Sequence, residues 1–465
     1  MDPLDHLPAE LVSEIFLLCL APGRQIQGCS WMEITVSHVC QRWRRWALST
    51  PRLWSTIHVQ CTERTLIRVE AYLARSKRAP LDVEVRIRAP HYEENGPELV
   101  PLVLRQIILQ CHRWQRFDLR VRVRANFWGM YGGLFSNIAV PQLVDLYIDM
   151  CHSPDPEPNA DPPANSFTPN IFGVGSAGNL RRVSCRVHGQ GSVWTRSPRY
   201  PMPPLASAEE LFLSFHHARS ALLPFAALNK ASQSLRHLHI QFLGTLQPKI
   251  LHPPPQLQHL TSLWLDSVRN DFLLNGGVVF PALTYLVLQH MSYPKVSTVP
   301  TEAVRASFPV LKHLASTLSI VTQESQIEAE YISNMAWHIS TLTLIETVRH
   351  PNDPPIEDLI KSSNWKNLKT IKFDFVRGAP IDSQRALDMV KAVMKGAKSL
   401  RERRGRPVEL EMMRWTVWQL RKKFPATMNE VEETFSVTEV QRVAIKWPEP
   451  HTSVVSPLDF GPMDD

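Results

Sequence analysis

The sequence LRHLHI at residues 235–240 recurs in pattern as LTSLWL at 260–265 and as LTYLVL at 283–288. In all three hexapeptides, apolar residues occupy the first, fourth and sixth positions. The same pattern continues in both directions along the chain, with first positions at Leu143, Leu180, Ala208, Leu235, Leu260, Leu283, Leu311, Ile339 and Leu368. These positions are 23 to 37 residues apart, and such a period predicts a repeat architecture with one β-strand in each unit.

A single unit of this size cannot bury its apolar edge alone, so it must stack on its neighbours, as leucine-rich repeats do. The repeats are irregular, because the Asn or Cys that usually follows the strand is mostly missing and Ser316 replaces the last apolar residue of the unit at 311. Strands without the full pattern are predicted at 53–59, 81–87, 117–123 and 408–412. We therefore predict an α/β solenoid with a parallel sheet over residues 56–415, followed by a C-terminal cap and tail at 416–465.

The first fifty-odd residues have a different, helical periodicity. Apolar residues recur at helical spacing over residues 8–20, where Pro8 suits the first turn of a helix, and again over residues 31–48,. Ala21-Pro22-Gly23 and Ser49-Thr50-Pro51 end the two segments. Two short helices bury too little surface to be stable alone, so we expect them to pack on a further element or on a partner.

These residues also resemble a known motif. LPAEL at 7–11, IF at 15–16, VSHVCQRWRRWA at 36–47 and PRLW at 51–54 are together similar to the F-box motif, in the form common in large fungal families. The stretch between residues 23 and 30 departs from the usual short link. The resemblance implies a domain at 1–55 that docks the Skp-type linker of SCF ubiquitin ligases, and through it a cullin, by means of Leu7, Pro8, Leu11, Ile15, Val39, Cys40 and Trp43. These residues could equally be core residues of the helices, and both roles are compatible.

With that resemblance, the irregular repeats are expected to bind a protein substrate. In each unit the fourth and sixth residues point into the core, so the fifth points to the opposite face of the sheet. These fifth residues are Tyr147, Ser184, Phe212, His239, Trp264, Val287, Thr343 and Lys372. We predict that Phe212, His239, Trp264 and Val287 form one patch that contacts the substrate. The alternative is that another segment covers this patch as ordinary core.

Composition and motifs argue against other classes of function. Hydrophobic residues make up 44% of the chain and charged residues 20%, as in a folded globular protein,. GVGSAG at 173–178 fits the dinucleotide fingerprint G-x-G-x-x-G, but a Pro-rich segment precedes it and a repeat strand follows, where the fingerprint needs a strand and a helix. No hydrolase, zinc-protease or P-loop motif occurs, and the seven cysteines contain no C-x-x-C pair,. We expect no enzyme activity, no cofactor and no metal site.

Partners and location follow from charge and hydropathy. No apolar run approaches the length of a membrane span, and residues 1–6 lack the basic flank of a secretory signal,. We therefore expect no membrane partner and a cytoplasmic or nuclear location. The net charge of +7 leaves open a rival function, a non-ligase binding module for an acidic partner such as nucleic acid. Its best support is the alternation that places Arg120, Arg122 and Arg124 on one strand face,. We favour a solvated strand face there, and the lack of interleaved aromatic residues argues against single-stranded nucleic acid.

Overall fold

The structure is a computed structural model that describes residues 7–19, 32–60, 63–123, 127–136, 138–152, 172–173, 177–188, 203–216, 228–229, 231–243, 256–266, 279–289, 305–317, 337–346, 365, 367–375, 383–404 and 408–440. Contacts between Cα atoms group the chain into two units. The first comprises residues 1–193, 199–204 and 446–465, and the second comprises residues 194–198 and 205–445. The domain boundaries predicted from the sequence at residues 55 and 415 stay predictions.

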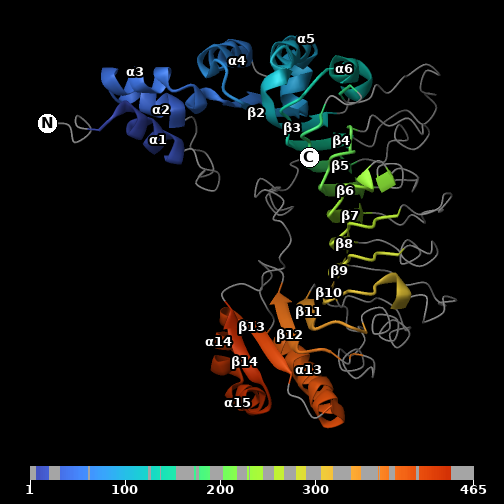
Figure 1. Cartoon of the computed structure of the whole chain (residues 1–465). Coiled ribbons are helices and arrows are strands. Elements are labelled where there is room, and N and C mark those ends of the chain that lie inside the picture. The colour runs from blue at the N-terminus through green and yellow to red at the C-terminus, as the bar shows by residue number, and fades with distance from the viewer. Residues whose placement is uncertain are drawn as a thin grey trace. The chain divides into compact units, whose positions relative to one another are not determined.

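The described residues form fourteen strands, which follow one another in the order of the sequence. Within each unit every paired strand is parallel to its neighbour (Figure 1). The strands of the first unit are β1 (Thr56–Gln60), β2 (Leu81–Arg88), β3 (Trp114–Val123), β4 (Asp145–His152) and β5 (Arg182–His188). Those of the second are β6 (Glu210–His216), β7 (His237–Leu243), β8 (Ser262–Asp266), β9 (Tyr285–Gln289), β10 (His313–Thr317), β11 (Thr341–Glu346), β12 (Thr370–Phe375), β13 (Glu409–Met413) and β14 (Ser436–Val440).

The apolar pattern predicted these strands well. Each of the nine patterned units forms a strand, β4 to β12, that begins two residues after the first apolar position of the unit. That first residue closes a tight turn: the backbone N–H of Leu283, for example, donates to the carbonyl of Phe280 at 3.2 Å, and Leu143 donates likewise to Val140. The strand predicted at 53–59 is shorter, because residues 51–54 form a 3₁₀ turn, η2 (Pro51–Trp54), before β1. Strand β14 lies in the region predicted as a cap and was not foreseen.

Three further helices and a short 3₁₀ turn accompany the strands of the first unit. These are α4 (Glu63–Ser76), α5 (Ala89–Ile108), η3 (Cys111–Arg113) and α6 (Phe127–Phe135), and α4 and α5 pack together between successive strands. The core beneath the sheet is aromatic: the Trp114 and Phe117 rings stack at 4.4 Å, and Phe135 lies 5.8 Å from Phe117. Along strand β2, buried residues alternate with half-buried or exposed ones. One face of the sheet therefore packs on the core, and the side chains of the other face are accessible to solvent.

The N-terminal helices differ from the prediction at one point. Helix α1 (Ala9–Cys19) agrees with the helix predicted at 8–20, but the second predicted helix is two, α2 (Met32–Val39) and α3 (Gln41–Ser49). Cys40 separates them with an extended backbone, and its Sγ accepts a hydrogen bond from the N–H of Trp43 at 3.4 Å. Cys40 therefore caps the N-terminus of α3, a role that serine and threonine usually fill.

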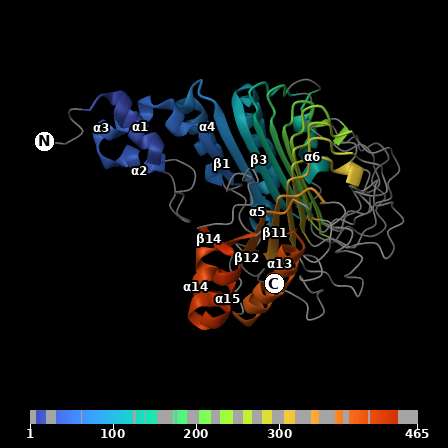
Figure 2. The same ribbon diagram turned by 60° about the horizontal axis from the view of Figure 1, so that its bottom comes forward.

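Three helices lie in the C-terminal part of the second unit, around the strands β13 and β14. They are α13 (Ser383–Arg404), α14 (Arg414–Lys423) and α15 (Pro425–Thr434), and they pack on one another, with α14 against β13 and α15 against β14 (Figure 2). Buried side chains such as Val393, Val417 and Val431 join them. The helix predicted from the sequence at 381–400 corresponds to α13.

Candidate functional site

Helix α1 has two apolar faces. Val12 and Phe16 point inward and are buried, whereas Leu11, Ile15 and Leu18 are 51%, 43% and 68% exposed. Because these three residues are spaced at i, i+4 and i+7, they form one stripe along the helix. Val39, at the end of α2, is also exposed, at 56%. Apolar residues exposed together on a small helical block are typical of a protein interface.

The other residues predicted to dock a linker divide into two groups. Pro8 and Cys40 are exposed, whereas Leu7 and Trp43 are half-buried. The Trp43 ring lies 5.2 Å from that of Phe16, so Trp43 takes part in packing α3 against α1. Leu18 was missed in the sequence analysis, although its spacing from Leu11 places it on the same stripe.

Several contacts hold this helical block to α4 within the first unit. The Tyr72 hydroxyl of α4 donates to the Glu33 carboxylate of α2, and the indole N–H of Trp54 donates to the carbonyl of Ala47 at 2.8 Å. Tyr72 also meets Trp54 edge to face at 5.2 Å, and the Arg75 guanidinium lies 4.3 Å above the same indole. Burial, together with the hydrogen bond to Glu33, raises the pKa of Tyr72. The helices that expose the apolar stripe are therefore packed firmly against the first repeat.

In the second unit, the residues predicted to contact a substrate lie side by side. Phe212, His239, Trp264 and Val287 occupy the same register position on β6, β7, β8 and β9. The Phe212 and His239 rings meet edge to face at 4.4 Å, and His239 stacks on Trp264 at 4.5 Å. The predicted adjacency of the four residues is confirmed.

Their exposure, however, differs from that of an open patch. His239, which lies between the rings of Phe212 and Trp264 along the row, is only 8% exposed. Val287 is fully buried, because the larger side chains of Trp264 and Tyr285 pack against Val287 and Ala315. The half-buried members of the row are Phe212 and Trp264, so any partner would reach these first. Tyr285, whose ring lies 5.8 Å from that of His313, widens the aromatic row and was not foreseen, since it lies two residues before Val287 on β9.

A polar ladder borders this aromatic row. The Ser214 hydroxyl lies 3.0 Å from the Gln241 amide oxygen, and the Gln241 amide donates to Asp266 at 2.8 Å. The Trp264 indole N–H donates to Gln289 at 3.2 Å. These contacts align the side chains of β6 to β9, and they present hydrogen-bonding groups next to the rings.

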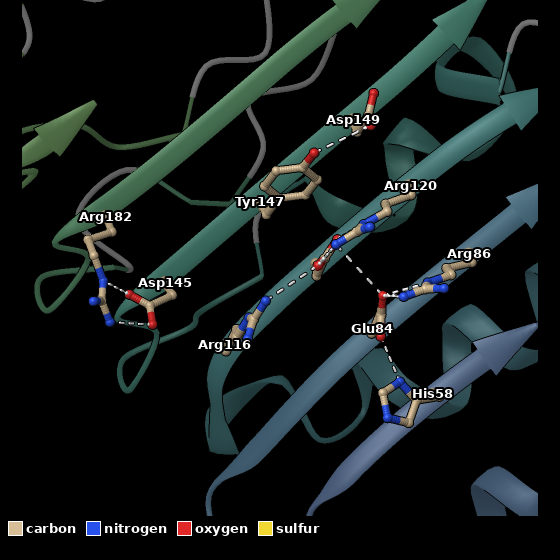
Figure 3. A network of polar contacts seen from close by, with 10 residues as sticks. His58, Glu84, Arg86, Arg116, Arg120, Asp145, Tyr147, Asp149 and Arg182 are labelled. Carbon is tan, nitrogen blue, oxygen red and sulfur yellow. Dashed lines mark hydrogen bonds and ion pairs between the residues drawn. The ribbon is translucent and has the colours of Figure 1, made fainter. Parts of the chain in front are cut away.

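The corresponding face of the first unit is charged (Figure 3). Glu84 on β2 binds the His58 imidazole at 2.7 Å, the Arg86 guanidinium at 2.5 Å and, more weakly, Arg120 at 3.8 Å. Arg120 in turn makes two hydrogen bonds to Asp118, of 3.0 and 2.9 Å. Burial works to raise the pKa of Glu84, but the hydrogen bond with His58 and the charges of Arg86 and Arg120 outweigh it and hold that pKa at about 2,.

Tyr147 on β4 continues the charged network. The guanidiniums of Arg120 and Arg186 lie 4.9 Å and 5.9 Å from the centre of its ring, and its hydroxyl donates to Asp149 at 3.4 Å. Burial, reinforced by the Asp149 carboxylate, raises the pKa of Tyr147 to about 12. The tyrosine therefore stays neutral at physiological pH.

This network corrects our interpretation of the arginines on β3. Arg120 is half-buried and engaged with Asp118 and Glu84, so it does not belong to a freely solvated strand face. Arg122 is exposed, and Arg124 lies outside the described residues. The rival nucleic-acid function requires a row of accessible arginines on β3. The engagement of Arg120 with two carboxylates argues against such a row.

The structure also bears on metal binding, membrane spans and the glycine-rich segment at 173–178. In the part of the chain that the structure describes, no three His, Cys, Asp or Glu side chains are grouped so that they could hold a metal ion. No described helix combines the length and the apolar character needed to cross a membrane. Gly178 lies in a turn that leads into β5, which is the setting that argued against a dinucleotide site.

Comparison with known proteins adds no relative. A scan against models of protein families finds none that matches this chain, and no curated protein matches its sequence significantly. The likeness to the F-box motif therefore rests on the residues quoted above, and what it implies is a proposal.

Proposed function

We propose that this chain is an F-box-type adaptor of an SCF-type cullin-RING ubiquitin ligase. In this role α1 to α3 dock a Skp-type linker, and the repeats hold a protein substrate. The observation that carries the proposal is the exposed stripe of Leu11, Ile15 and Leu18 on α1, together with the exposed Val39 of α2, on the helices that resemble the motif. Such a role needs no catalytic residue in this chain, because the ligase machinery that the linker recruits would transfer ubiquitin in the cytoplasm or nucleus.

The attachment of the helical block also supports the proposal. An adaptor must hold its linker-binding helices in a defined position on its repeats, and the contacts of Tyr72 and Trp54 with α2 and α3 do so on the first repeat of the first unit. The substrate would lie on the sheet face opposite the apolar core, where Phe212 and Trp264 are half-buried.

The test is docking of a purified Skp-type linker to the full-length chain. Leu11→Asp should weaken binding by at least about tenfold, because a charge would be buried in the interface at a cost of about 2 kcal/mol or more. Ile67→Asp is the matched control: Ile67 is an exposed apolar residue of α4 in the same unit and outside the helical block. Equal binding by both variants, with folding verified by circular dichroism, would count against the proposal.

The rival function makes a different forecast for the same proteins. A non-ligase module for an acidic partner would bind that partner in a strongly salt-sensitive way through arginines of β3, and Leu11→Asp would leave this binding unchanged. Exposure of Arg122 favours this second candidate, and the engagement of Arg120 with two carboxylates opposes it for nucleic acid.

A further inference from the structure

The sheet has an open edge at its last strand. In the described part of the chain, β14 ends the strand order and pairs only with β13 (Figure 1). Alternate residues of a parallel strand direct their backbone N–H and C=O groups to opposite sides. In this sheet the first residue of a strand donates towards the preceding strand, as Thr370 of β12 does to the carbonyl of Ser340 at 3.1 Å.

The same alternation sets the backbone of β14. Ser436 and Thr438, its first and third residues, face β13, so the backbone N–H and C=O groups of Val437 and Glu439 point to the outer side. No described strand pairs with this outer side. Ser436, Thr438 and Glu439 are also exposed, so an extended chain arriving from solution can reach the outward backbone groups.

The edge at the other end of the strand order is covered. On the outer side of β1, the carbonyl of His58 accepts a hydrogen bond from the Arg68 guanidinium of α4 at 2.8 Å. The carbonyl of Gln60 accepts one from the Thr65 hydroxyl of the same helix. Proteins usually cover sheet edges, because uncovered backbone groups pair readily with another chain. The open edge of β14 is therefore a candidate docking strand.

Carboxylates outnumber cations on the sheet face that carries Thr438. On this face, Glu409 and Glu411 of β13 neighbour β14. Lys372 of β12 pairs with Glu411 at 2.5 Å, whereas Glu409 accepts a hydrogen bond from the Thr438 hydroxyl at 2.9 Å. A lysine or arginine on an added strand would lie next to Thr438, within reach of the Glu409 carboxylate.

The opposite face has the same excess of carboxylate. Arg421 of α14 pairs with Glu432 of α15 at 2.8 Å and with Glu439 of β14 at 2.6 Å. One guanidinium therefore serves two carboxylates there. The ion pairs next to the open edge thus leave a carboxylate in excess on both faces, which favours a basic partner.

We propose that β14 docks an extended, lysine- or arginine-bearing segment of a partner protein, which adds to the sheet as a further strand. The segment would form main-chain hydrogen bonds with Val437 and Glu439, and its basic side chains would pair with the excess carboxylates. A second copy of the chain fits less well, because two five-residue strands bury little area and would bring two acidic edges together. This inference goes beyond the proposed function, since it assigns a surface separate from the apolar stripe of α1 and from the aromatic row.

The experiment measures binding of fluorescently labelled peptides to the full-length chain by fluorescence anisotropy. The peptides alternate threonine with valine and carry lysine, serine or glutamate at the same threonine positions. Val437→Pro removes an outward N–H and places a ring on the edge. Val437→Ala is its control, because it shortens the same side chain and retains the N–H. Glu409→Gln tests the charge, with Glu70→Gln, at an exposed position of α4, as its control.

We expect the lysine version to bind most tightly and the glutamate version most weakly. Val437→Pro should weaken binding of the lysine version by about tenfold, and Val437→Ala by less than about twofold. Glu409→Gln should weaken it by about threefold and leave the serine version unchanged, and Glu70→Gln should change neither. N-methylation of alternate peptide amides gives a second measurement on the unaltered protein. One alternate set should abolish binding and the other should not, because an added strand turns only one of its sides to β14.

Equal binding by the two Val437 variants, or by the two N-methylated sets, would overturn the inference. Tightest binding of the glutamate version, no binding of any version, or a wild-type dimer that Val437→Pro dissociates in light scattering would do the same. If Val437→Pro fails to fold, the two N-methylated sets decide alone. Retained linker docking in any of these cases would leave the proposed function standing.

Discussion

Glu84 lies between positively charged side chains that would otherwise repel one another. It is the carboxylate that His58, Arg86 and Arg120 share, so its ionised form is favoured by the folded state. Its pKa falls from an ordinary 4.5 to about 2 on folding. A group with a depressed pKa contributes stability that is fully present above the unfolded value and is lost as the pH falls towards the folded value.

We therefore predict that Glu84→Gln lowers the free energy of unfolding at neutral pH by an amount on the order of 3 kcal/mol. The difference from the wild type should shrink as the pH falls from 4.5 to about 2, because the wild-type carboxylate then becomes protonated. Urea unfolding at a series of pH values measures this difference. A gap that stays constant over that range would show that the lost hydrogen bonds, and not the charge, stabilise the network.

Cys40 shows where reasoning from residue spacing stops. The apolar positions of α2 and α3 continue one helical pattern, since Val36, Val39, Cys40 and Trp43 keep helical spacing, so the sequence predicts a single helix. The break depends on an extended backbone at Cys40 and on a hydrogen bond from Trp43 to its Sγ. The spacing of apolar residues indicates which face of a helix is apolar. It does not reveal a one-residue break in the helix when the apolar residues on both sides of the break stay on the same face.

At the scale of elements, the repeat strands were the most predictable part of the fold. Their apolar residues face the core at every second position, and the strands begin at a constant offset from the tight turn that precedes them. Strand β14 was missed because SVTEV has only two apolar residues, both valines. The order of side chains across the sheet was also predictable, because parallel register converts equal positions in successive repeats into neighbours.

What the sequence could not predict is how much of that row stays accessible. Val287 and Ala315 are covered by the larger Trp264 and Tyr285, and such covering depends on rotamers of residues in different repeats. The charged network around Glu84 was likewise not foreseen, because its members come from strands that lack the full pattern.

We predict that Phe212→Ala/Trp264→Ala removes a subset of the proteins that co-purify with the chain while the linker remains bound. The two rings are the half-buried part of the aromatic row, and large aromatic residues often carry most of the energy of an interface. Quantitative mass spectrometry of purified complexes checks this result, with Trp418→Ala as a control, since Trp418 is an exposed tryptophan of α14. Simultaneous loss of the linker, or a lowered melting temperature, would instead make the row a structural element.

For the whole molecule, the stacking of repeats implies that damage stays local. Each strand contacts its neighbours along the sheet, and in such arrays stability is close to a sum of repeat and nearest-neighbour contributions. Leu263 on β8 is completely buried, and its replacement by alanine should cost about 2 to 5 kcal/mol.

We predict that Leu263→Ala raises hydrogen exchange in β7, β8 and β9 while linker docking and the exchange of β2 to β4 remain unchanged. Hydrogen exchange followed by mass spectrometry resolves these segments. A uniform rise across both units would show that the chain unfolds as one cooperative body, contrary to the behaviour expected of stacked repeats.

The junction of Tyr72 with Glu33, and of Trp54 with Ala47 and Arg75, has a mechanical consequence under the proposed function. A linker docked on α1 to α3 would keep a fixed orientation relative to α4, because the helices that bind it cannot rotate freely against the first repeat. A ubiquitin-transferring enzyme recruited through that linker would then approach the first unit from a limited range of directions. The lysine that receives ubiquitin would then be the one whose position and orientation suit the transferring enzyme. Two substrates bound with equal affinity could therefore be ubiquitinated at very different rates.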